Sequence, residues 1–153
     1  MAEVGEVVIR ELEEKDLKAI IEIDRKLLGQ SRPEYWQLKV ELSEQASPLA
    51  SLVADNGGRV VGFVLGNASG WEFGIPDTVG WIDTLGVDPA YHHQGIGRLL
   101  LFEMIGNMKK VGVEKIYTLV SWRSGNLLEF FDKLGFQRGD MINLELDIRG
   151  RSM

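Results

Sequence analysis

Cysteine is absent from the 153 residues, which excludes disulfides, thiolate nucleophiles and cysteine-ligated zinc. Histidine is nearly absent too: the chain has only His92 and His93. No third ligand accompanies them, so we predict no metal site. Long apolar runs are also missing, and none approaches the ~18 residues that a membrane-spanning helix needs. Residues 1–10 carry acidic groups and no apolar stretch, so we expect no signal peptide, no membrane partner and a cytoplasmic location.

Positive charge is in short supply. The chain has 17 lysines and arginines against 23 aspartates and glutamates, a net charge of −6. An acidic body does not attract nucleic-acid phosphates, so we predict no nucleic-acid partner, whereas cationic molecules such as amines are tolerated. The rest of the composition is ordinary for a globular protein, with 44% hydrophobic and 26% charged residues. The length favours a single domain over residues 1–153.

Hydrophobic periodicity predicts alternating strands and helices. The predicted strands are 7–12, 49–54, 60–65, 79–87, 115–121, 136–138 and 142–148, and the predicted helices are 16–28, 33–46, 96–108 and 127–134. Asn56-Gly57-Gly58 has the composition of a hairpin turn. Residues 66–78 form a predicted loop that contains Trp71, Glu72 and Phe73. Antiparallel hairpins combined with one βαβ unit indicate an α/β sheet with helices packed on it.

The segment from Leu85 to Leu101 is a predicted strand, glycine-rich turn and helix. The start of a helix offers unpaired N–H groups and a partial positive charge, a combination that binds phosphate. Gly95 and Gly97 let the backbone approach a ligand closely. The N–H groups from His93 to Arg98 could therefore surround a pyrophosphate. A Rossmann site is not predicted, because the third glycine and the later acidic residue of that fingerprint are missing.

Two motifs in this sequence resemble those of the GNAT acetyltransferase superfamily. The first is Leu85-Gly86-Val87-Asp88-Pro89 followed by His92-His93-Gln94-Gly95-Ile96-Gly97. The second is the late helix ending in Lys133-Leu134-Gly135-Phe136. The order of elements is similar as well, over nearly the whole chain. The resemblance implies a GNAT-type mixed, mostly antiparallel sheet of about seven strands, with a splayed central parallel pair and about four helices.

The resemblance also implies acetyl-CoA as co-substrate. The backbone of Leu85, Gly86 and Val87 would bind the pantetheine arm as an added strand would, and Asn126 would lie beside the thiol end. The pyrophosphate would be held by the turn and its helix, through residues His92, His93, Gln94, Gly95, Ile96, Gly97 and Arg98. Two positions depart from the family pattern. His92 replaces the leading Gln or Arg, and Phe131 replaces the tyrosine that often protonates the leaving thiolate.

Asp83 is the candidate catalytic base, because the family often places acids on this strand. Strand alternation puts Trp81, Asp83, Leu85 and Val87 on one face, and Ile82, Thr84 and Gly86 on the other. A carboxylate on an apolar strand needs a partner, so a structural hydrogen bond or a contact with the substrate amine is an equal alternative. Trp122 and Arg123 could line the acceptor mouth, and Tyr35 and Trp36 could do the same, although we interpret the last two as packing residues. Tyr117 is also interpreted as a packing residue, with a role as substitute for the missing tyrosine as the alternative.

These observations predict an acetyl-CoA-dependent N-acetyltransferase. It would move an acetyl group directly to a primary amine of a small molecule or protein. The alternative is a GNAT-like sensor or scaffold that binds acyl-CoA without turnover, which Phe131 favours. Members of the family often dimerise, so the resemblance also allows a homodimer.

Overall fold

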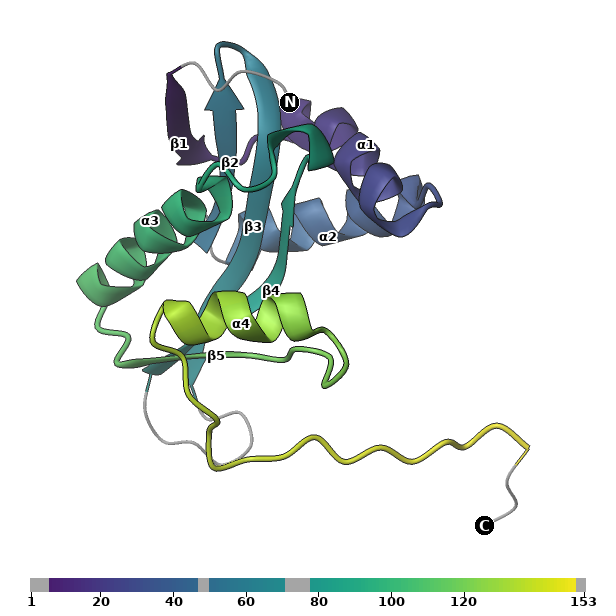
Figure 1. Cartoon of the computed structure of the whole chain (residues 1–153), viewed down its shortest axis with the longest axis vertical. Coiled ribbons are helices and arrows are strands. Elements are labelled where there is room, and N and C mark those ends of the chain that lie inside the picture. Colours follow the sequence, from purple (N-terminus) through teal and green to yellow (C-terminus); the bar gives the residue numbers. More distant parts are fainter. Residues whose placement is uncertain (1–5, 47–49, 71–77, 151–153) are drawn as a thin grey trace. The chain divides into compact units, whose positions relative to one another are not determined.

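The computed structural model describes residues 6–46, 50–70 and 78–150, and the chain divides into two units (Figure 1). The first unit, Met1–Leu119, holds one five-stranded sheet and three of the α-helices. The second, Val120–Met153, holds helix α4. Within the described ranges, no helix is long and apolar enough to cross a membrane. The single domain over residues 1–153 stays a prediction.

The sheet has the strand order β1-β2-β3-β4-β5. Its strands are β1 (Val7–Glu11), β2 (Ser51–Asn56), β3 (Arg59–Gly70), β4 (Thr78–Val87) and β5 (Lys115–Thr118). The first four are antiparallel neighbours, and β5 runs parallel to β4. Helix α3 (Ile96–Lys110) makes the connection that a parallel pair requires. The mixed α/β fold with a parallel pair, predicted from the sequence, is confirmed, but in the described residues this pair lies at the edge of the sheet rather than at its centre.

The number of strands differs from the prediction. The strands expected at 136–138 and 142–148 are absent from the described residues, so the sheet has five strands rather than about seven. The apolar side chains of the second segment alternate as in a strand, yet they are 57–83% exposed: Ile142, Leu144, Leu146 and Ile148. Alternation shows which side chains a segment could bury, but a strand also needs a backbone partner, which the pattern does not reveal.

Helices α1 (Leu17–Leu28) and α2 (Pro33–Ala46) cover one face of the sheet (Figure 1). Gly29 ends α1 in the left-handed conformation, with φ 89°, and its N–H donates to the carbonyl of Arg25. The buried core on this face joins both helices to β2 and β3, through Ile20, Ile23, Trp36, Val40, Val53, Phe63 and Leu65. The two helices are therefore fixed against the sheet by apolar burial.

Helix α3 lies against the opposite face, where glycines allow a close approach. A Cβ on Gly62 would come within 3.1 Å of Ile96 and 3.2 Å of Leu100. A Cβ on Gly66 would collide with the backbone carbonyl of Trp81. At these two positions there is too little room for a side chain, which lets α3 pack closely over β3.

Strand β4 contains a bulge at Asp83. Leu65 pairs with Thr84, but the next residue, Gly66, pairs with Ile82, so the ladder passes over Asp83. Because a bulge adds one residue to its strand, the side chains beyond it lie on the opposite face from the one that strict alternation assigns. A Cβ on Gly86 would point at Phe63 and Leu27, on the α1 side. The predicted shared face of Trp81, Asp83, Leu85 and Val87 is therefore wrong for its last two members, because strict alternation cannot anticipate a bulge.

In the second unit, α4 (Gly125–Lys133) ends at the motif noted in the sequence. Gly135 takes φ 95°, its N–H donates to the Asp132 carbonyl, and the Phe136 N–H donates to the Phe131 carbonyl. This pair of bonds is a Schellman cap. It returns the Phe136 ring to within 5.0 Å of the Phe131 ring, between centroids. Gly135 and Phe136 of this motif therefore serve to end the helix and to pack the chain back against it.

Candidate active site

Strand β4 separates from β5 halfway along its length. The parallel ladder runs from Val79↔Lys115 to Ile82↔Thr118, where the Thr118 hydroxyl donates to the Ile82 carbonyl at 3.1 Å. Strand β5 then ends, three residues before the predicted end at position 121. The β5 side of residues 83–87 is therefore outside the ladder. An extended ligand can add to such an edge as another strand would.

The turn after β4 has the backbone conformation of an anion cradle. His93 has φ 64° and Gly95 has φ 79°, both left-handed. Gly95 is the N-cap of α3, and the first backbone bond into the helix runs from the Leu99 N–H to the Gly95 carbonyl. The N–H groups of the first turn have no partner within the helix, and a Cβ on Gly95 would meet nothing within 4 Å. This backbone can accommodate a pyrophosphate.

The side chains of the cradle have distinct roles. His92 Nε2 lies 2.8 Å from the Val87 carbonyl oxygen. A carbonyl only accepts, so Nε2 carries the hydrogen and the ring ties the turn to β4. Ile96 is buried against the sheet and leaves only its backbone for a ligand. Arg98 is exposed, with its guanidinium carbon 5.0 Å from the Phe102 ring centroid.

Asp88, at the end of β4, fixes the cradle to the body of the first unit. Its carboxylate accepts from the Ala90 N–H and from Lys26 Nζ of α1, each at 3.0 Å. Its own N–H donates to the Val61 carbonyl of β3. Burial alone would raise the pKa of Asp88, but the hydrogen bonds from Ala90 and Lys26 outweigh it and lower the pKa. The carboxylate is therefore held ionised at the start of the turn.

Asp83, the candidate base, projects from the bulge toward α2 and forms an ion pair with Lys39. The two side chains are 45% and 24% exposed. Lys39 Nζ also lies 5.3 Å from the centroid of the Tyr35 ring, one helical turn earlier. Burial acts to lower the pKa of Lys39, but hydrogen bonds to Asp83 and Tyr35 outweigh it and raise the pKa. Lys39 is therefore a firmly protonated cation beside the candidate base.

The aromatic residues near Asp83 divide between the core and the site. Trp36 is buried, as predicted, but Tyr35 is 42% exposed and belongs to the Lys39 cluster rather than to the core. Trp81 pairs across the ladder with Tyr117, and their ring centroids lie 5.1 Å apart. Sequence reasoning missed Lys39, and only its place one turn after Tyr35 could have drawn attention to it.

The helix that carries Lys39 is held in place by an ion pair between the two helices. Arg32, just before α2, donates to both oxygens of Asp24 in α1, at 2.8 and 3.0 Å. These hydrogen bonds outweigh burial and hold the pKa of Asp24 below its usual range. The Arg32 guanidinium also lies 4.4 Å from the Tyr35 ring centroid. The same arginine thus positions both the helix and the aromatic ring beside Lys39.

Other sequence candidates belong to the second unit or lie outside the described residues. Asn126 is an exposed residue in the first turn of α4, and Trp122 and Arg123 are exposed just before that helix, all in the second unit. Phe131 packs between Phe130 and Phe136 in this unit, with ring centroids at 5.3 and 5.0 Å. Trp71, Glu72 and Phe73 lie outside the described residues.

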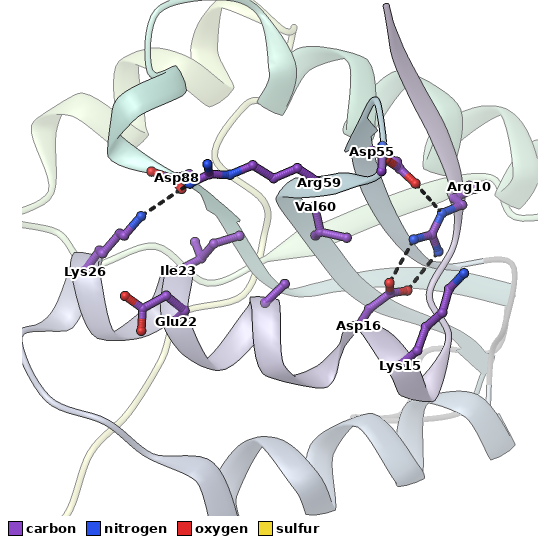
Figure 2. A pocket seen from close by; sticks show the side chains of 12 residues that line it. Arg10, Lys15, Asp16, Glu22, Ile23, Lys26, Asp55, Arg59, Val60 and Asp88 are labelled. Carbon is purple, nitrogen blue, oxygen red and sulfur yellow. Dashed lines mark hydrogen bonds and ion pairs between the residues drawn. The ribbon is translucent and has the colours of Figure 1, made fainter. Parts of the chain in front are cut away.

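A hollow of about 490 Å³ lies between α1 and the β2–β3 hairpin (Figure 2). It is lined by four cations and four carboxylates: Arg10, Lys15, Lys26, Arg59, Asp16, Glu22, Asp55 and Asp88. Neither Asp83 nor any cradle residue from 92 to 98 lines it. Because none of these residues lines it, the hollow is not the candidate active site.

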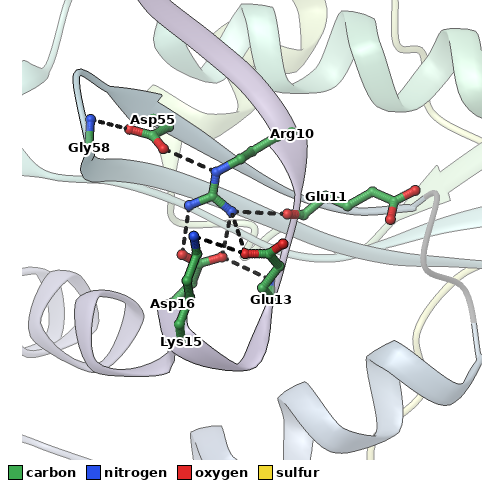
Figure 3. Close-up of polar contacts among 7 residues, drawn as sticks. All are labelled: Arg10, Glu11, Glu13, Lys15, Asp16, Asp55 and Gly58. Atoms are coloured by element: carbon green, nitrogen blue, oxygen red, sulfur yellow. Dashed lines mark hydrogen bonds and ion pairs between the residues drawn. The ribbon is translucent and has the colours of Figure 1, made fainter.

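Arg10 ties together the carboxylates at one end of this hollow (Figure 3). Its guanidinium donates to both oxygens of Asp16 at 2.8 Å and to Asp55 at 3.1 Å. Burial would raise the pKa of Asp16, but hydrogen bonds from Arg10 and from the Glu13 N–H outweigh it and lower the pKa. The network is structural, because it fixes β1 to the start of α1 and to the β2–β3 hairpin.

Comparison with known proteins identifies the class. The sequence profile of the Acetyltransferase (GNAT) family matches residues 17–136. N-alpha-acetyltransferase RimI of Mycobacterium tuberculosis is 32% identical over 142 residues, which cover 90% of this chain and 82% of that protein. The mycothiol acetyltransferase of Thermomonospora curvata is 27% identical over 107 residues. That match covers 67% of this chain but about a third (34%) of the longer protein.

Solved structures have the same fold. Aminoglycoside N-acetyltransferase AAC(6')-Iy in complex with CoA matches with a TM-score of 0.79 and 17% identity, over 93% of this chain and 95% of that one. The ribosomal-protein-S18-alanine N-acetyltransferase of Escherichia coli matches with a TM-score of 0.69 and 24% identity, over 88% and 79%. The chain therefore belongs to the GNAT acetyltransferase family. Acetyl-CoA is the co-substrate typical of this family, and the free edge of β4 and the cradle at α3 are compatible with it.

Proposed function

We propose that this protein transfers the acetyl group of acetyl-CoA directly to a primary amine. The observation that carries the proposal is the layout of β4. Its second half leaves β5 after Ile82, its end runs into a left-handed turn at the start of α3, and its bulge projects a carboxylate. One strand thus offers an edge for an extended ligand, a cradle for phosphate and an acid beside them.

The cofactor would be held mainly by backbone. Peptide groups of Leu85, Gly86 and Val87 would bond the pantetheine arm, and N–H groups between His92 and Arg98 would bond the pyrophosphate. Asn126 would lie near the thiol end, as in the family. When bound, acetyl-CoA supplies the activated acetyl thioester. Backbone recognition explains why His92, whose ring bonds Val87, can replace the usual leading residue of the motif.

Asp83 would receive the acceptor amine. An amine reaches the site mostly as an ammonium ion and must lose a proton before it can attack a carbonyl carbon. A carboxylate held beside the free edge of β4 can bind that ammonium and take up its proton. The existing ion pair with Lys39 supports the first part of this role, because it shows that the position accepts an alkylammonium.

The names of the similar proteins point to several kinds of acceptor, so the proposal names a class of acceptor, primary amines, rather than one compound. The similar proteins are named for a protein alanine, for mycothiol and for aminoglycosides. A peptide with a free N-terminal alanine is the first acceptor to try. The RimI relative, whose similarity covers most of both chains, is named an N-alpha-acetyltransferase, and the Escherichia coli structure is named for a protein alanine. We also retain the cytoplasm as the proposed compartment, and the homodimer stays a prediction.

A second candidate is a sensor or scaffold that binds acyl-CoA without turnover. Phe131 favours it, since a phenyl ring cannot protonate a leaving thiolate and is packed between Phe130 and Phe136. Direct transfer then requires water or a substrate group to supply that proton. A screen would separate the two readings: acetyl-CoA binding without turnover of any amine supports the sensor.

Asp83→Asn tests the enzymatic proposal. The variant should bind acetyl-CoA as the wild type does but lose at least about a hundredfold in kcat, the usual contribution of a general base. Glu14→Gln, which changes an exposed carboxylate of the first unit that lies on neither β4 nor α2, is the control. Calorimetry measures the affinity for acetyl-CoA, and steady-state kinetics measure kcat and the acceptor KM. An unchanged kcat with a raised acceptor KM would reduce Asp83 to a binding contact, and no change in either would remove it from the mechanism.

A further inference from the structure

Lys39 occupies the place on Asp83 that an acceptor ammonium would need. Its ammonium group pairs with the carboxylate that the β4 bulge directs toward α2. A protonated primary amine of an acceptor is the same chemical group, a terminal alkylammonium. Two such groups cannot share one carboxylate at ion-pair distance without repelling each other. Lys39 and the acceptor should therefore compete for Asp83.

The pair can be displaced. Asp83 is nearly half exposed and Lys39 a quarter exposed, and ion pairs between groups this accessible are weak because water screens them. Tyr35 would stabilise the lysine after displacement, since its ring centroid already lies 5.3 Å from Nζ. Lys39 can therefore swing away from Asp83 while keeping a favourable contact.

Lys39 is poorly suited to be an acceptor itself. It is a residue of α2, held between Asp83 and the Tyr35 ring, so an acetylated Lys39 could not dissociate as a product and would stop turnover. Among the described side chains, Arg32 is a second cation over the same Tyr35 ring, but its bidentate bond to Asp24 holds it there. Lys39 is thus the cation placed to exchange with a substrate.

We propose that Lys39 is an internal stand-in for the acceptor's ammonium, which gives way when a cationic primary amine binds Asp83. This inference rests on the proposed function of Asp83 and adds a residue that determines specificity. It predicts that the enzyme prefers amines that arrive protonated. Only a cationic acceptor can replace the ion pair that Asp83 loses when Lys39 moves away. It also predicts that removing Lys39 improves acceptor binding, the opposite of the effect of removing a binding residue.

The test compares acceptor binding and turnover in Lys39→Met and the wild type. The probe is a short peptide with a free N-terminal alanine and no other amine, titrated calorimetrically into the protein saturated with CoA. The acceptor Kd and KM should fall about three- to fivefold in Lys39→Met, while the acetyl-CoA KM stays unchanged. Lys39→Arg keeps a cation and should bind the peptide as the wild type does.

Two controls isolate the competition. Lys15→Met removes a lysine that is paired with Glu13 and lies outside the site, so it should change nothing. In an Asp83→Asn background, Lys39→Met should give no further gain, because the shared carboxylate is gone. Equal affinity of Lys39→Met and the wild type would overturn the stand-in role, as would weaker binding. Acetylation of Lys39 by acetyl-CoA alone, seen by mass spectrometry of the wild type, would also overturn it.

The two proposals fail in different ways. If the wild type turns over no amine but Lys39→Met still binds the peptide more tightly, the stand-in role survives and the enzymatic proposal does not. If turnover is normal and Lys39→Met shows no gain, the reverse holds.

Discussion

Gly95 combines two properties that make it the most informative single residue of the cradle. It has φ 79°, and a Cβ there would point into open space. Its replacement is therefore harmful for two separable reasons: backbone strain in the left-handed region and obstruction of a ligand that comes close to the backbone. Gly112 has φ 88° and equally open surroundings, but it lies beyond the other end of α3.

Gly95→Val should lower the affinity for CoA at least about a hundredfold, as expected from the loss of one or two charge-assisted hydrogen bonds. Gly112→Val carries the same kind of backbone strain and should lose a similar amount of stability, about 1–2 kcal/mol, yet bind CoA normally. Calorimetric titration with CoA measures the first effect and urea unfolding the second. If Gly95→Val bound CoA like the wild type, the assignment of the cradle would be wrong.

At the residue scale, the sequence identified candidate residues better than it identified the residues that contact them. The turn residues of the cradle could be predicted, because positive φ selects glycine and a helix start binds anions. Asp83 could be predicted as a candidate from its strand. Its partner Lys39 could not, since the pair joins residues 44 positions apart through a bulge that leaves no mark in the composition.

At the scale of elements, helix α3 depends on glycines in the strands beneath it. Gly66 has no room for a Cβ, because the Trp81 carbonyl belongs to rigid backbone. Gly106, inside α3, has open surroundings and no backbone requirement for glycine. The same substitution should therefore have opposite signs at the two positions.

Gly66→Ala should lower the free energy of unfolding by about 1–3 kcal/mol, as expected for overpacking. Gly106→Ala should raise it by about 0.5–1 kcal/mol, because alanine favours a helix. Urea unfolding followed by circular dichroism measures both. A neutral result for Gly66→Ala would mean that β3 and β4 can move apart at little cost.

Helices and strands that carry their own hydrophobic periodicity and caps could be predicted from the sequence. The pairing of one strand with another could not. The four α-helices and most of the first five strands lie close to their predicted positions because burial on one face marks them locally. Strand β3 is the exception, since it continues to Gly70 through the first part of the predicted loop 66–78. The two final strands were predicted from the same pattern and are absent from the described residues. For residues 142–148, hydrophobic alternation alone gave no information about a neighbouring strand.

For the molecule as a whole, three buried carboxylates govern the response to acid. Asp16, Asp24 and Asp88 are each held ionised by a cation, and the pKa of each is lowered in the folded state. A depressed folded pKa contributes stability above the unfolded value, about 3.9 for aspartate. That contribution is lost as the pH falls through the folded value.

The free energy of unfolding should therefore be nearly constant around neutral pH and fall steadily below about pH 4. Asp16→Asn should cost about 2–3 kcal/mol at pH 7, since it leaves Arg10 with fewer partners, and the pH dependence should become shallower. Urea unfolding at a series of pH values measures both effects, with Asp140→Asn as the neutral control. An unchanged slope in Asp16→Asn would show that this carboxylate titrates alike in the folded and unfolded chain.

The position of Asp83 outside the pairing of β4 makes it tolerant of one kind of mutation and intolerant of another. A different side chain there alters no cross-strand pair, so substitutions at position 83 should leave the sheet intact, whatever their effect on the proposed chemistry. Deleting Asp83 would instead move every later side chain of β4 to the opposite face of the sheet. Gly86 would then exchange places with its larger neighbours, and a bulky side chain would be driven into the Phe63 ring.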